Sequence, residues 1–149
     1  MFTLDAIMTT ELITLLPTAN LAEARELMHK NKIHHLPVVD DSNRLIGLVT
    51  LTNVLAATDS ILRDPDKSIQ PADVAVKDIM VTDVATVDER ASLRQAALFL
   101  EKHRIGCLPV VTEGMLKGII TETDFVAVAI NLLEQLEDGE PDDEFAEAG

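Results

Sequence analysis

The chain has 149 residues, of which 47% are hydrophobic and 26% charged, and its formal net charge is −14. This composition excludes a disordered chain, and the acidic balance argues against nucleic-acid binding, which needs clustered Lys and Arg. No apolar run approaches the roughly 18 to 20 residues that cross a bilayer, and the first residues lack the basic and apolar regions of a signal peptide. We therefore expect a folded, cytoplasmic protein with neither membrane nor nucleic-acid partners.

The first part of the chain predicts one β-α-β-β-α unit. A β-rich piece at 12–16 leads into a helix that Asn20 caps, with apolar residues at helical spacing and a basic last turn. Two β-branched runs follow, 36–39 and 45–50, and the polar turn between them is typical of a hairpin. A second helix is expected at about 53–62.

The second part of the chain repeats this order. A β-rich piece at 84–87 precedes a helix that starts with the capping box of Ser92 and Gln95. A hairpin is expected at 108–121 and a final helix at about 123–136. Matching residues lie 72 positions apart up to the hairpin turn and 71 apart after it. The missing residue falls in a turn, where its loss leaves the flanking elements in register.

These observations predict a mixed α/β (α+β) fold of two βαββα repeats packed with pseudo-twofold symmetry. The first repeat spans 1–62, a polar linker 63–73, the second repeat 74–136, and an acidic, disordered tail 137–149. A unit of about 60 residues buries only about 60% of its unfolded surface, so we expect the repeats to share a core. Such packing creates two equivalent clefts between them.

The residues that catalysis or metal binding would need are scarce. Cys107 is the single cysteine, which excludes an internal disulfide and a multi-cysteine metal site, and we interpret it as a small core residue. His34 and His35 are adjacent but have no third ligand at a suitable spacing. No nucleophile with an orienting base can be assembled from the remaining residues. We expect neither a metal site nor enzymatic activity.

The repeated motifs resemble those of the paired cystathionine-β-synthase (CBS) domain, or Bateman module. They are Ile-Met at 7–8 and 79–80, Leu-Pro-Val-Val at 36–39 and 108–111, and the segments 47–53 and 118–124. The resemblance covers about residues 1 to 133. It implies a βαββα fold in each repeat, an adenosyl ligand such as AMP, ATP or S-adenosylmethionine in the clefts, and dimerisation into a flat four-domain disc.

Thr121 and Asp124 are the first candidates for ligand binding. A carboxylate in the first turn of a helix can accept both hydroxyls of a ribose, while the threonine shapes the backbone before it. The same two residues can instead form a capping box, and one pair can serve both purposes. Thr50 and Asn53 occupy these places in the first repeat, where a neutral amide makes weaker hydroxyl contacts than a carboxylate.

The resemblance implies further contacts with the phosphates and the base. His34 and His35 stand where the family often has basic residues near the ligand phosphates, although they equally suit a solvated surface. The second repeat has Gly106 and Cys107 there, with Arg104 slightly upstream. Four threonines lie on the segments that help to line the base pocket in the family, and each also suits a strand: Thr10, Thr14, Thr82 and Thr86.

The sequence therefore favours a regulatory module that binds an adenosyl nucleotide (AMP, ADP, ATP or S-adenosylmethionine) between its repeats. It would signal to a separate effector protein, would require no cofactor and would form a homodimer. The alternative is a structural or protein-interaction module with degenerate, empty nucleotide sites. The uncharged Asn53, Gly106 and Cys107 favour that alternative.

Overall fold

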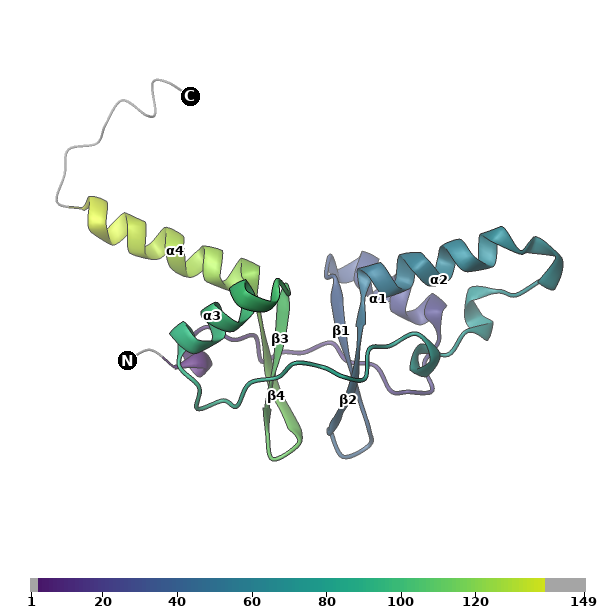
Figure 1. The fold of residues 1–149 in the computed structure, drawn as a ribbon, viewed down its shortest axis with the longest axis horizontal. Coiled ribbons are helices and arrows are strands. Elements are labelled where there is room, and N and C mark those ends of the chain that lie inside the picture. Colours follow the sequence, from purple (N-terminus) through teal and green to yellow (C-terminus); the bar gives the residue numbers. More distant parts are fainter. Residues whose placement is uncertain (1–2, 139–149) are drawn as a thin grey trace, which may run out of the picture.

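The computed structural model describes residues 3–138, and its two halves repeat one order of elements (Figure 1). The first half contains η1 (Leu4–Ala6), α1 (Leu21–Asn31), β1 (His35–Val39), β2 (Leu45–Thr50) and α2 (Leu51–Arg63). The second half contains η4 (Val76–Asp78), α3 (Leu93–His103), β3 (Cys107–Thr112), β4 (Met115–Thr121) and α4 (Glu122–Glu137). The linker between the halves carries the short 3-10 turns η2 (Pro65–Lys67) and η3 (Pro71–Asp73).

The predicted mixed fold of two repeats is confirmed. Each half has a two-stranded antiparallel sheet, β1 with β2 and β3 with β4. The β-rich pieces at 12–16 and 84–87 make only single parallel bridges, Leu15 with Val38 and Val87 with Val110. Of the predicted tail 137–149, the part from 139 onward lies outside the described residues. Within the described residues, no helix has both the length and the apolarity needed to cross a membrane.

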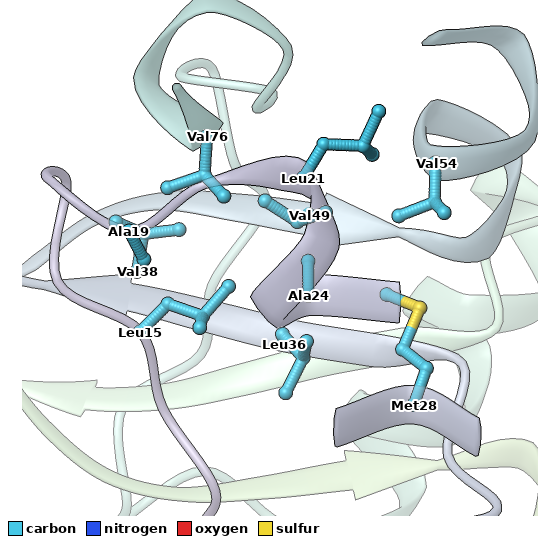
Figure 2. Packing of buried hydrophobic residues seen from close by; sticks show 10 residues of the cluster. All are labelled: Leu15, Ala19, Leu21, Ala24, Met28, Leu36, Val38, Val49, Val54 and Val76. Atoms are coloured by element: carbon cyan, nitrogen blue, oxygen red, sulfur yellow. The ribbon is translucent and has the colours of Figure 1, made fainter. Parts of the chain in front are cut away.

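The leading segment of each half packs on the other half. Leu4 is fully buried among Leu100, Ile120 and other core residues of the second half. Val76 belongs to the first-half core, which also holds Leu21 and the other residues drawn in Figure 2. Figure 1 shows the two leading segments, in purple and in teal, crossing between the halves in opposite directions. Each hydrophobic core therefore contains residues from both sequence repeats, because the leading segment of one repeat packs in the core of the other.

The Ile-Met motif gains a physical explanation from this exchange. Thr9 and Ile119 exchange backbone hydrogen bonds of 2.9 and 3.0 Å, which ties the first leading segment to β4. Met8 then lies directly on Gly118, where an added Cβ would meet its Sδ at 2.8 Å. Met80 packs against Gly47 of β2 in the equivalent way. The glycines are required because the crossing segment approaches so closely.

Hydrogen bonds between the tips of the two hairpins connect the halves a second time. Leu45 N donates to Gly114 O over 3.2 Å, and Leu116 N donates to Asn43 O over 3.0 Å. The Asn43 side-chain amide also donates to Leu116 O over 2.9 Å. Because these tips are joined at one end, the space between the halves lies at the other end, where β1 and β3 begin.

Candidate functional site

A cavity of about 430 Å³ lies between the two halves, and we call it the Asp124 cavity. The second half contributes the first turn of α4, and the first half contributes the end of α1, the start of β1 and one residue of its leading segment. Its lining residues are Thr9, Lys32, Ile33, His34, His35, Gly106, Ile119, Thr121, Glu122, Thr123 and Asp124. A molecule bound in this cavity would contact both halves at once.

Asp124 caps the helix on which it stands. Its Oδ2 accepts hydrogen bonds from the Thr121 backbone N–H, at 2.9 Å, and from the Thr121 hydroxyl, at 3.3 Å. The capping interpretation of this pair is therefore correct in the structure. Oδ1 accepts no hydrogen bond from the described residues, so the carboxylate keeps one oxygen available to a bound molecule. Thr50 and Asn53 form the equivalent capping box in the first half.

The opposite wall of the Asp124 cavity is basic. Lys32 ends α1 in the left-handed conformation, with φ of 54°, and turns the chain toward β1. The His34 carbonyl accepts a hydrogen bond from Leu51 N over 2.9 Å, which fixes the turn between α1 and β1 against α2. One lysine and two histidines thus face the cavity, together with the acidic Glu122 and Asp124.

His35 is a half-buried histidine held next to a glycine. Burial lowers the pKa of His35, the neighbouring His34 lowers it further, and Glu122 acts in the opposite direction. A Cβ on Gly106 would lie 3.8 Å from both His35 Cε1 and Glu122 Oε1. These are ordinary van der Waals distances, so Gly106 lies against the imidazole without crowding it. Because its pKa is lowered, the imidazole of His35 is predominantly neutral at pH 7.

A second cavity of about 270 Å³ lies beside the first, and we call it the Thr50 cavity. It is lined by His35, Leu48, Thr50, Val81, Asp83, Val84, Ala85, Ile105, Gly106 and Cys107. His35 and Gly106 belong to both cavities. Burial, reinforced by the charge of Asp124, raises the pKa of the Cys107 thiol to about 12, so this side chain is a neutral, apolar part of the wall.

The structure brings together seven of the thirteen residues that the sequence indicated. Five line the Asp124 cavity: His34, His35, Gly106, Thr121 and Asp124. Thr50 and Cys107 line the Thr50 cavity. Six residues line neither of these two cavities: Asn53, Arg104, Thr10, Thr14, Thr82 and Thr86. Thr10 and Thr82 are exposed to solvent.

Several lining residues were not anticipated from the sequence. In the Asp124 cavity they include Thr9, Lys32 and Glu122, and in the Thr50 cavity they include Asp83. Lys32 could have been found from the repeat, because it is equivalent to the candidate Arg104, which lies 72 positions later. Nothing in the sequence indicated Thr9 or Asp83, since their positions depend on the exchange of the leading segments. Within residues 3–138, no group of three His, Cys, Asp or Glu side chains is arranged to hold a metal ion.

Two similar halves that exchange their leading segments and enclose cavities between them define a paired module of two α/β repeats. The family model for the CBS domain matches residues 4–60 and 76–131. The chain belongs to the CBS domain family, as a tandem pair.

Known proteins agree with this assignment. A Vibrio cholerae protein assigned to acetoin utilization (AcuB) has 40% identity and a TM-score of 0.80, over 95% of this chain and 99% of that one. CBSX2 in complex with AMP has 29% identity and a TM-score of 0.76, over 89% of this chain and 98% of that one. Homoserine O-acetyltransferase from Methanocorpusculum labreanum is 34% identical over 74% of this chain, which spans only 20% of that enzyme's length.

Proposed function

We propose that this chain is a regulatory module that binds an adenosyl nucleotide in the Asp124 cavity. The observation that carries the proposal is the composition of this cavity, which joins Thr121 and Asp124 of one half to Lys32 and His34 of the other. Its volume of about 430 Å³ falls within the roughly 300 to 1,000 Å³ of small-molecule sites. The AMP bound to CBSX2 supports the same class of ligand.

The ribose would be held at the α4 end of the cavity. Asp124 Oδ1 accepts no hydrogen bond within the described residues, and hydrogen bonds from hydroxyls to a carboxylate are stronger than those to a neutral oxygen. Capping by Thr121 fixes the carboxylate before the ligand arrives, so little side-chain entropy is lost on binding. The same pair thus ends the helix and prepares the ribose site.

The phosphate would lie toward Lys32 and His34. The lysine ammonium group and the ring N–H groups of the two histidines are donors that suit phosphate oxygens. The Thr50 cavity is the weaker candidate, because its volume of about 270 Å³ is below the usual range and Asn53 does not line it. We therefore propose one principal site for each chain.

A ligand in the Asp124 cavity would regulate by holding the halves at one mutual angle. Its differential affinity for the two arrangements supplies the effect, typically about 1 to 3 kcal/mol of coupling. The proposal includes a homodimer and a separate effector protein in the cytoplasm. It includes no catalytic step, and the ligand is AMP, ADP, ATP or S-adenosylmethionine.

Isothermal titration calorimetry with these four ligands tests the proposal. At least one should give saturable binding with one principal site per chain. If none of them binds, the proposal fails, and the alternative of an interaction module with empty sites takes its place. Thermal shift with an added dye provides an independent reading, since the chain contains no Trp or Tyr for intrinsic fluorescence.

A further inference from the structure

Glu122 is an acidic residue of the Asp124 cavity that the proposed contacts with ribose and phosphate leave unused. It is the first residue of α4, and its side chain is exposed at the cavity. Within residues 3–138, the Glu122 carboxylate takes part in no ion pair and in no side-chain hydrogen bond. It is therefore available to interact with a bound molecule.

The fold does not require an acid at this position. Glu122 N donates a backbone hydrogen bond to Gly106 O over 3.2 Å, which ties the start of α4 to the start of β3. Leu51, its counterpart 71 positions earlier, donates in the same way to His34 O over 2.9 Å. A leucine thus serves the backbone equally well, so the charge of Glu122 needs another explanation.

The Glu122 carboxylate lies close to the basic wall of the cavity. Its Oε1 and His35 Cε1 each lie 3.8 Å from the point where a Cβ on Gly106 would stand, so carboxylate and imidazole are on the same side of this glycine. Burial and the charge of His34 lower the pKa of His35, and Glu122 raises it, as a negative charge near an imidazole does. Glu122 therefore acts on the part of the cavity where the phosphate of a nucleotide is proposed to lie.

The basic residues of the cavity are too few for a polyphosphate. Lys32 is the single Lys or Arg among the described residues that line it, and it faces two acids, Glu122 and Asp124. The formal charges of these three side chains sum to −1. Each additional phosphate would bring negative charge toward Glu122 without meeting a further lysine or arginine, and like charges brought together at a binding site cost free energy.

We propose that Glu122 makes the Asp124 cavity selective for adenosyl ligands whose tail carries at most one phosphate group. AMP has a single phosphate. S-adenosylmethionine has none, and its sulfonium and ammonium groups can pair with the carboxylate. ADP and ATP are rejected because their further phosphates approach Glu122. This inference rests on the proposed function and narrows its ligand class.

Isothermal titration calorimetry in magnesium-free buffer tests the selectivity, because each phosphate then keeps its charge. The tighter-binding ligand of AMP and S-adenosylmethionine should bind at least about tenfold more tightly than ATP, with ADP between them. An ATP affinity equal to or above that of both would overturn the inference. Binding by none of the four ligands would refute the proposed function itself.

Glu122→Gln keeps the size of the side chain and removes its charge. This variant should raise the affinity for ATP by about fivefold, raise that for ADP less, and leave that for AMP within about twofold. It should not raise the affinity for S-adenosylmethionine. Glu113→Gln removes the same formal charge from the exposed tip of the second hairpin, at the other end of the strands, and is the matched control. Equal gains for all four ligands, or equal gains in both variants, would contradict selection by charge.

The alternative role of Glu122 is to stabilise α4, since an acid in the first turn suits the helix dipole. That role predicts a lower melting temperature for Glu122→Gln and the same change in affinity for every ligand. Salt separates the two roles further. Because screening weakens repulsion between exposed charges, the preference over ATP should decrease as sodium chloride rises from about 50 to about 500 mM. A preference that does not change with salt would overturn the inference.

Discussion

Thr121 directs both its backbone N–H and its hydroxyl at a single oxygen of Asp124, over 2.9 and 3.3 Å. The capping box and the proposed ribose contact therefore use different oxygens of one carboxylate. In the first half, Asn53 Oδ1 accepts the Thr50 N–H in the same way, over 2.9 Å. An amide is thus sufficient for the cap but lacks the charge.

This comparison suggests Asp124→Asn as the sharpest test of the ligand site. The variant keeps the cap, as Asn53 does, so its melting temperature should change little. Loss of the charge should weaken nucleotide binding by about 1 to 2 kcal/mol, or roughly five- to thirtyfold. Calorimetry measures the affinity, with Asn53→Ala as the control that should affect it less. Unchanged affinity in Asp124→Asn would remove this residue from the site.

The lowered pKa of His35 should make the stability of the fold depend on pH. Because burial lowers its pKa in the folded protein, the unfolded chain binds more protons as the pH falls below about 6.5. Stability should therefore decrease on acidification through this window, and His35→Gln should reduce the slope. Urea denaturation at a series of pH values measures it, with the exposed His29→Gln as control. Parallel pH profiles for the native chain and His35→Gln would contradict the assignment.

Adding one methyl group at Gly118 should lower the stability of the fold strongly. A Cβ at this position would lie 2.8 Å from Met8 Sδ and 2.9 Å from the Thr9 carbonyl, which is held by its hydrogen bond to Ile119. Gly118→Ala should destabilise the fold by about 1 to 3 kcal/mol in urea denaturation. Gly106→Ala meets only contacts of 3.8 Å or more and should cost much less. Similar costs at both glycines would argue against the close crossing of Met8.

Cys107 should be unreactive in the folded protein. Burial and the charge of Asp124 raise the pKa of its thiol to about 12, and only the thiolate is a good nucleophile. An aromatic disulfide reagent at pH 8 should react slowly with native protein and fully in denaturant. Rapid reaction of the native thiol would show that the wall of the Thr50 cavity opens readily.

The sequence by itself determined the repeat, the four helices and the two hairpins. These features depend on neighbours in the chain: Asn20 and Ser92 cap helices that follow immediately, and the hairpin strands are joined by short polar turns. Asp124 was also recognisable, because a carboxylate three residues after Thr121 has a meaning within one helical turn. Local hydrogen bonds and periodicity leave few alternatives for such segments.

Only the tertiary structure decided which half each leading segment joins. Leu4 and Val76 occupy equivalent places in similar repeats, so each could fill either core as far as hydrophobic pattern is concerned. The exchange brings Thr9 to β4 and excludes Thr10 and Thr14 from the Asp124 cavity. It also brings Asp83 to the Thr50 cavity. The physical reason is that burial rewards any apolar side chain that fits, whereas the choice between two similar cores depends on long-range packing.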